Sequence, residues 1–84
     1  MKFLGYTKLP VDVMACRLEQ PTTVPTAEGI LHAEVGDYLI IGIRGEIYLV
    51  KAAVFPDLYS SKDDPDLSVE QQDTLLRLSS SIAL

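Results

Sequence analysis

One hairpin signal constrains the fold of this chain more than any other feature of its sequence. Residues 38–43 (YLIIGI) and 46–50 (EIYLV) are rich in β-branched and aromatic side chains, and an Arg-Gly pair at 44–45 separates them. Two such stretches around a short glycine-containing break are typical of a β-hairpin. We therefore expect an antiparallel pair of strands at the centre of the fold.

A two-residue loop at 44–45 would fix which residues of the hairpin face each other, because side chains alternate between the two sides of a strand. The expected pairs are Ile43 with Glu46, Ile41 with Tyr48, and Leu39 with Val50. Both faces of such a hairpin are largely apolar, which a hairpin exposed to water does not tolerate. We expect one face in a barrel-like core and the other face under a helix or a second subunit.

A set of glycine, acidic and aromatic residues recurs around this hairpin. Its members are Gly36-Asp37-Tyr38, Gly42, Gly45-Glu46, Tyr48, Phe55 and Tyr59. This pattern resembles the GDY and GE-x-Y signature of the PGDYG-like family of small, uncharacterised bacteriophage and prophage proteins, over residues 6–59. The chain departs from it at Val35 and Leu49, where the family often has proline, and in its further helix. The resemblance implies a phage origin and a compact β-rich domain, and it transfers no catalytic residue.

The length of 84 residues predicts one small soluble domain. We expect a β-rich part over residues 1–60, followed over residues 61–84 by an acidic connector and a C-terminal helix that packs on it or lies at an interface. A chain of this length buries only about 60–65% of its unfolded surface, so homodimer formation would help to stabilise the core.

The net charge of −5 and the apolar pattern bear on partners and location. An acidic surface repels phosphate backbones, so we expect no direct nucleic-acid binding and favour a basic protein partner; DNA mimicry would need a denser acidic array. No apolar run approaches the roughly 20 residues that span a bilayer, so we expect no membrane partner. Cys16 is the single cysteine, which is compatible with a reducing compartment. Together with the phage origin that the resemblance implies, the expected location is the cytoplasm of the bacterial host.

The remaining segments predict an α+β fold: a small bent antiparallel sheet or partly open barrel of about five strands, with two helices. Strands are expected at 2–6, 11–18 and 29–34, a short helix within 51–59, and a connector at 60–67. Proline at 21 and 25 favours a loop or an extended crossing segment over residues 20–28, which is the best candidate for a mobile binding loop.

The last segment predicts an amphipathic helix. Ser68 is a favourable N-cap, and Gln71 three residues later completes a capping box. The stripe at helical spacing consists of Val69, Gln72, Leu75, Leu76, Leu78 and Ile82. Two interpretations remain open: the stripe packs on the sheet, or it forms an interface through Val69, Leu75, Leu78 and Ile82.

Chemistry-bearing residues are few. His32 has no neighbouring histidine, cysteine pair or acidic cluster, so no metal site or cofactor is predicted. Cys16 would act as a nucleophile only with His32 or a cation beside it, and a lone cysteine in an apolar strand is usually packing. We therefore expect no enzyme activity.

Two functions follow as hypotheses. The first is a phage accessory protein that binds a host protein, with inhibition of a bacterial defence system as one form of it. The alternative is an oligomeric module that binds or sequesters a small nucleotide-like signal. Its expected lining is Arg44, Glu46, Tyr48 and Lys51, because an anionic ligand needs cationic donors and an aromatic stacking face.

Overall fold

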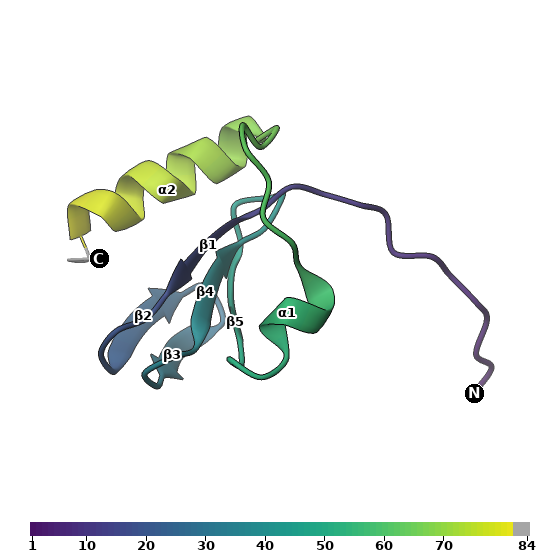
Figure 1. Ribbon diagram of the computed structural model, residues 1–84, viewed down its shortest axis with the longest axis horizontal. Coiled ribbons are helices and arrows are strands. Elements are labelled where there is room, and N and C mark those ends of the chain that lie inside the picture. The colour runs from purple at the N-terminus through teal and green to yellow at the C-terminus, as the bar shows by residue number, and fades with distance from the viewer. Residues whose placement is uncertain (82–84) are drawn as a thin grey trace.

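Five short antiparallel strands and two helices make up the fold, which a computed structural model describes over residues 1–81 (Figure 1). They are β1 (Met14–Arg17), β2 (Thr22–Thr26), β3 (Gly29–Ala33), β4 (Tyr38–Ile41), β5 (Ile47–Val50), α1 (Phe55–Leu58) and α2 (Val69–Ser81). The strands form a three-stranded sheet in the order β1-β4-β5 and a two-stranded ribbon, β2-β3. This open arrangement confirms the expected α+β class. Among residues 1–81, neither helix has the length and apolarity to cross a bilayer.

The central hairpin exists as predicted, but its loop has three residues, 43–45, and the expected register is wrong. The Gly42 amide donates to the Glu46 carbonyl at 2.9 Å, and the Gly45 amide donates to the Gly42 carbonyl at 2.8 Å. Gly45 has a φ of 79°, so the loop is a turn followed by a glycine bulge. The extra residue shifts the pairing by one position. Tyr48 consequently lies opposite Ile40, on the other face from the one expected.

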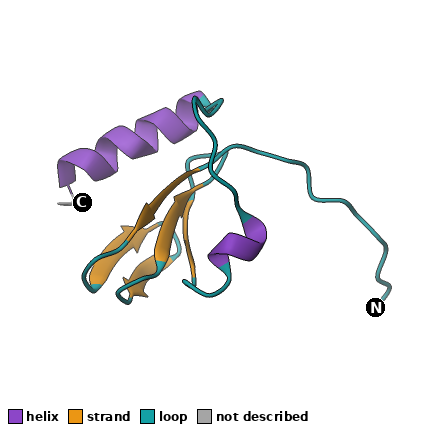
Figure 2. Ribbon diagram, viewed as in Figure 1, coloured by secondary structure: helices purple, strands orange, loops and turns teal. Residues whose placement is uncertain are grey.

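One face of the three-stranded sheet forms the main core. Leu39 and Ile41 of β4 are almost completely buried there, and α2 covers them on the side away from α1 (Figure 2). The buried members of this core are Leu18, Val24, Ala33, Leu39, Ile41 and Leu78, with Met14, Cys16, Ile47, Leu49 and Leu75 packed around them. Burying one aliphatic side chain of this size contributes about 1.5–3 kcal/mol, so these few residues are a main source of the stability.

The segment at residues 20–28 contains β2 and the turn into β3, so it is extended, which is one of the two expected forms, and the expected mobile loop is wrong. Val24 of β2 has no exposed surface and belongs to the core. Pro25 lies opposite Ile30 in the β2–β3 ribbon. Both strands of a two-stranded ribbon have a free edge, and proline is tolerated on edge strands because a missing N–H there costs no ladder bond. The prolines at 21 and 25 therefore wrongly indicated a loop at this position.

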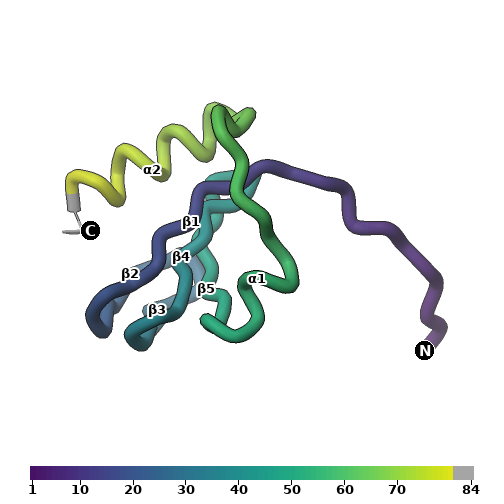
Figure 3. The backbone as a smooth tube through the Cα atoms, in the orientation of Figure 1, coloured from purple at the N-terminus to yellow at the C-terminus, as the bar shows by residue number. Residues whose placement is uncertain are grey.

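Residues 1–13, which we call the arm, contain no strand, so the strand expected at 2–6 is wrong. The arm runs away from the body as an extended chain (Figure 3). The strand expected at 11–18 begins only at Met14, where pairing with Ile41 starts. A strand needs a hydrogen-bonding neighbour, and no segment among residues 1–81 offers one to the arm.

The capping box at the start of α2 is confirmed. The Ser68 amide donates to Gln71 Oε1 at 2.8 Å, and the Gln71 amide donates to Ser68 Oγ at 3.1 Å. The expected apolar stripe is only partly correct, because Val69 and Leu76 are largely exposed. Gln71 and Thr74 are buried in their place.

Three polar side chains, those of Ser68 before α2 and of Gln71 and Thr74 in α2, explain why these positions face the sheet; we call them the latch. Ser68 Oγ donates to the Ile43 carbonyl, Gln71 Nε2 to the Ile41 carbonyl at 3.2 Å, and Thr74 Oγ1 to the Gly45 carbonyl at 2.8 Å. The latch thus satisfies backbone acceptors at the end of β4 and in the β4–β5 loop. A Cβ at Gly45 would lie 2.7 Å from the Glu70 carbonyl oxygen, so only glycine permits this approach.

Candidate functional site

The second face of the three-stranded sheet carries an aromatic stack. The Tyr38 and Phe55 rings lie 3.7 Å apart between centroids with an angle of 4° between their planes, and Tyr59 stacks on Phe55 at 5.0 Å. Pro56 in the first turn of α1 begins the helix that places Phe55 and Tyr59 on one side. Ile40 is fully buried on this face. The sheet is therefore covered by α2 on one face and by α1 on the other, as its two apolar faces predict.

A hydroxyl pair joins β5 to the end of α1. Tyr48 Oη and Tyr59 Oη are 3.0 Å apart, and either of them can donate. Burial, followed by the hydrogen bond with Tyr59, raises the pKa of Tyr48 well above its ordinary value. Tyr48 is consequently neutral at physiological pH, where its hydroxyl can donate or accept a hydrogen bond but supplies no charge.

A groove opens beside the aromatic stack, with a volume of about 830 Å³. Its floor is the second sheet face, and its walls are the base of the arm, α1 and the connector between α1 and α2. The lining residues are 8–15, Tyr38, Tyr48, Phe55, Leu58, Tyr59, 60–62 and Pro65. We call this hollow the aromatic groove. Its volume lies within the range of about 300–1,000 Å³ that is typical of ligand sites.

An ion pair holds the two walls of the aromatic groove together. Lys62 Nζ of the connector lies 2.7 Å from Asp12 Oδ2 of the arm, and the Asp66 amide donates to the same oxygen at 2.7 Å. The hydrogen bond from Lys62 is the main cause that lowers the pKa of Asp12, and the Asp66 amide adds to it. Asp12 is therefore ionised at neutral pH, and Lys62 is already paired.

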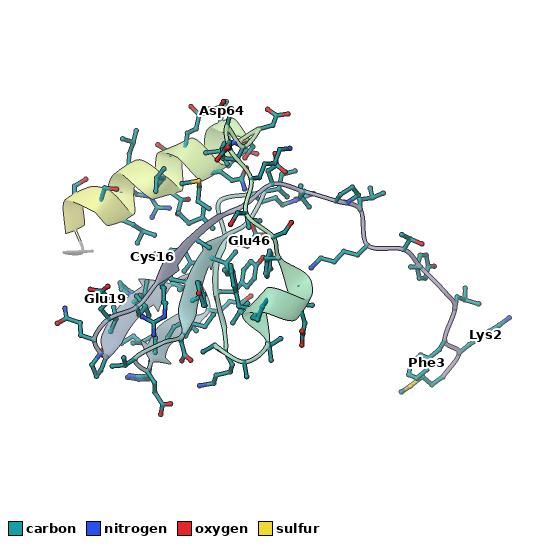
Figure 4. The ribbon with its side chains drawn as sticks, viewed as in Figure 1. Lys2, Phe3, Cys16, Glu19, Glu46 and Asp64 are labelled. Carbon is teal, nitrogen blue, oxygen red and sulfur yellow. The ribbon has the colours of Figure 1, made fainter. Side chains whose placement is uncertain are left out.

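The charge around the aromatic groove is acidic. Residues 55–67 contain four aspartates and one lysine. The aspartates are Asp57, Asp63, Asp64 and Asp66, and all of them are exposed. Asp64 lies where the connector approaches the start of α2 (Figure 4). None of these aspartates lines the aromatic groove, whose charged lining residues are Lys8, Asp12 and Lys62, so they make the surface beside the groove acidic and not its lining.

The predicted ligand set is not assembled by the fold. Tyr48 lines the aromatic groove, but Arg44 is exposed in the β4–β5 loop, where its amide donates to Glu46 Oε1 at 3.0 Å. Lys51 lies beyond the other end of β5 and contacts Asp37 Oδ2 at 3.3 Å. Four strand residues, at about 3.4 Å each, separate the two cations. Arg44 and Lys51 are close in the sequence but not in space, because they lie beyond opposite ends of β5.

The predicted interface residues do not share one surface. Val69 is exposed, Leu75 is half-buried, and Leu78 is buried in the core. Ile82 lies outside the described residues. Leu78 packs within the chain, so it is not available to a partner, whereas Val69 is accessible.

Cys16 and His32 lie apart in the fold. Cys16 faces the core beneath α2, and His32 is exposed on β3, opposite Thr23. No hydrogen bond joins them within the part of the chain that the structure describes, and residues 1–81 hold no group of three His, Cys, Asp or Glu side chains able to bind a metal ion.

The groove was missed at the level of sequence, although its aromatic residues belong to the pattern that recurs around the hairpin. Phe55 and Tyr59 stand four positions apart around Pro56, which is the spacing of two side chains on one helix face. That spacing could have indicated an aromatic surface. No sequence signal links Asp12 to Lys62, because their pairing depends on how the connector returns to the arm.

No protein-family model, curated protein or solved structure matches this chain. The resemblance to the PGDYG-like phage family therefore stays a prediction, and the functional argument depends on the fold and the aromatic groove.

Proposed function

We propose that this protein is a non-enzymatic binding module that takes an extended, apolar segment of a partner protein into the aromatic groove. The observation that carries the proposal is the groove itself, about 830 Å³ in volume and lined by Tyr38, Tyr48 and Phe55. Aromatic-lined grooves recognise extended segments, since flat rings give a large contact area and hydroxyl groups at the edge fix the orientation.

The acidic surface beside the groove bears on the chemistry of the partner segment. The exposed aspartates of the connector favour Lys or Arg beside the apolar side chains, and they disfavour an acidic segment. The net charge of −5 acts in the same direction at longer range. The proposed partner segment is therefore basic as well as apolar.

The biological setting of this proposal rests on the resemblance alone. In it, the protein is a phage accessory protein that acts in the host bacterial cytoplasm, and the segment belongs to a host protein, as in inhibition of a defence system. Sequestering the segment in the groove would block its native contact without any chemical step.

A small-molecule ligand is the second candidate function, and the volume of the groove favours it. The ligand would stack on the aromatic residues and use the Tyr48–Tyr59 hydroxyl pair. An anionic, nucleotide-like ligand would depend on Lys8, because Arg44 and Lys51 lie elsewhere and Lys62 is paired. An uncharged ring suits the site better.

Selection of random ten-residue peptides on the immobilised protein tests the proposal. Leu58 lines the groove and is exposed, so Leu58→Asp should abolish binding without unfolding the chain. Leu76→Asp changes an equally exposed leucine on α2 and is the matched control.

The expected result is enrichment of basic, aromatic peptides by the parent and by Leu76→Asp, with binding weakened at least tenfold in Leu58→Asp. If no peptide is enriched, or if Leu58→Asp binds as well as the parent, the peptide-binding function is wrong. Saturable binding of an uncharged aromatic compound in that case would favour the second candidate.

A further inference from the structure

The arm presents a run of apolar side chains with nothing packed against them. Phe3 is 88% exposed and Tyr6 is 89% exposed, and Leu4 and Leu9 are exposed as well. Lys2 and Phe3 lie at the far end of the arm, well away from the sheets and helices (Figure 4). Single exposed apolar residues are common, but a contiguous run of them marks a surface that binds something.

The base of the arm is fixed to the body. Gln71 Nε2 donates to the Asp12 carbonyl at 2.8 Å, and the Asp12 carboxylate is paired with Lys62. Pro10 holds its own φ and restricts Leu9 to extended conformations, so the chain does not reverse direction there. Residues 1–7 are thus directed away from the groove of their own chain.

Residues 1–7 and the rest of the chain are complementary in charge. Residues 1–7 hold one lysine and no acidic residue, whereas the rest of the chain holds six basic and twelve acidic residues, a formal net charge of −6. Residues 1–7 are thus basic and aromatic, which is the segment chemistry that an aromatic groove on an acidic body favours. Nothing else among residues 1–81 combines these two properties in an extended segment.

We propose that two copies of this chain exchange arms, so that residues 1–7 of each copy lie in the aromatic groove of the other. This inference rests on the proposed function, since it makes the arm the first occupant of the segment-binding groove. Reciprocal exchange about a two-fold axis fills both grooves and gives a closed dimer. An external partner segment then competes with the arm, and its apparent affinity falls as the protein concentration rises.

Measurement of molar mass across a concentration series, by light scattering and sedimentation, tests the exchange. The parent and the Leu76→Asp control should reach twice the chain mass of 9.2 kDa. The arm variant Phe3→Asp/Tyr6→Asp and the groove variant Leu58→Asp should each weaken the dimer by at least about 30-fold, as loss of a buried aromatic anchor does. Circular dichroism confirms that each variant is folded.

Mixing the two variants separates arm exchange from any other interface. The arm variant keeps an intact groove and the groove variant keeps an intact arm, so one arm–groove contact returns in the mixture. Mixed dimers should form although each variant alone is monomeric. Dimers that persist in both variants, or a mixture that stays monomeric, would overturn arm exchange.

The same proteins distinguish failure of arm exchange from failure of the proposed function. A monomeric parent whose groove still binds the selected peptides overturns the exchange and leaves the segment-binding function intact. A parent that neither dimerises nor binds peptide overturns both. If the exchange is correct, deletion of residues 1–7 should strengthen peptide binding, because the competing arm is gone.

Discussion

The side-chain amide of Gln71 donates to the backbone carbonyl of Asp12 at 2.8 Å, although 59 positions separate the two residues. Gln71 is completely buried and also donates to the Ile41 carbonyl. One side chain of α2 therefore fixes the central strand and the base of the arm at once. This contact sets the direction in which the arm leaves the body.

Gln71→Leu should lower the free energy of unfolding by about 2 kcal/mol or more. Leucine fills similar space but leaves the Asp12 and Ile41 carbonyls without this donor, and an unsatisfied buried group costs about 1–3 kcal/mol. Urea unfolding followed by circular dichroism measures the change, with the exposed neighbour Gln72→Leu as control. Equal stability of the two variants would show that these hydrogen bonds contribute little.

Gly45→Ala should destabilise the protein by about 2 kcal/mol or more. Its φ of 79° is strained for any residue with a Cβ, and the added atom would meet the rigid backbone of Glu70. Gly5→Ala is the matched control, since nothing lies within 4 Å of the position of its Cβ. Thermal unfolding of both variants tests this. A melting temperature of Gly45→Ala equal to that of the parent would contradict the close approach of α2.

Acidification should destabilise the protein through Asp37. The Glu34 amide, with a smaller contribution from Lys51, lowers the pKa of Asp37 below its ordinary value of 3.8. The folded state therefore holds this proton less tightly than the unfolded state, so the stabilisation is complete above about pH 4 and is lost as pH falls through the folded pKa. The pKa of Asp12 is lowered as well, so its contribution to stability is also lost as pH falls.

Asp37→Asn isolates the contribution of Asp37. The variant should be less stable than the parent at pH 7. Its stability should also change less than that of the parent between pH 5 and pH 2, the interval that the lowered pKa of Asp37 sets. Asp57→Asn, on the exposed side of α1, controls for the loss of one charge. Urea unfolding at several pH values gives both curves; parallel curves for the parent and Asp37→Asn would refute the assignment.

Alkaline pH should destabilise the protein through Tyr48. The pKa of Tyr48 is raised above its ordinary value of 10.0, so the unfolded state loses this proton first and stability falls as pH rises above about 10. Tyr59→Phe removes the hydrogen bond but leaves the burial, so it should lower the pKa of Tyr48 only in part. Phenolate absorbance during alkaline titration measures the change, and an unaltered titration in Tyr59→Phe would mean that the hydroxyl pair has no role.

The hairpin illustrates how far sequence reasoning reaches. The strands were predicted correctly, and the loop length was not. A two-residue loop of the common type requires positive φ at both positions, which Arg44 disfavours, whereas a three-residue loop needs it only at Gly45. The order Arg44-Gly45, with glycine second, therefore already favoured a three-residue loop.

The helix and the candidate site show where sequence reasoning stops. The capping box of Ser68 and Gln71 is local, so its residues predicted it. Gln71 and Thr74 are buried because they bind the carbonyls of Ile41 and Gly45, which are distant in the sequence. The spacing of apolar residues cannot indicate that. The aromatic groove likewise requires the base of the arm to meet the connector. The Asp12–Lys62 ion pair joins them, and only the structure shows that these two residues are close.

The position of the latch along the chain has a consequence for biosynthesis. The face of β4 that carries Leu39 and Ile41 is covered in part by Leu18, Val24 and Ala33, and completely only when Ser68 and the first turns of α2 are in place. While a ribosome is still translating the connector, a nascent chain would hold a complete hairpin with a partly uncovered apolar face. Such an intermediate is prone to aggregation until the helix emerges, so the last step of folding waits for the synthesis of α2.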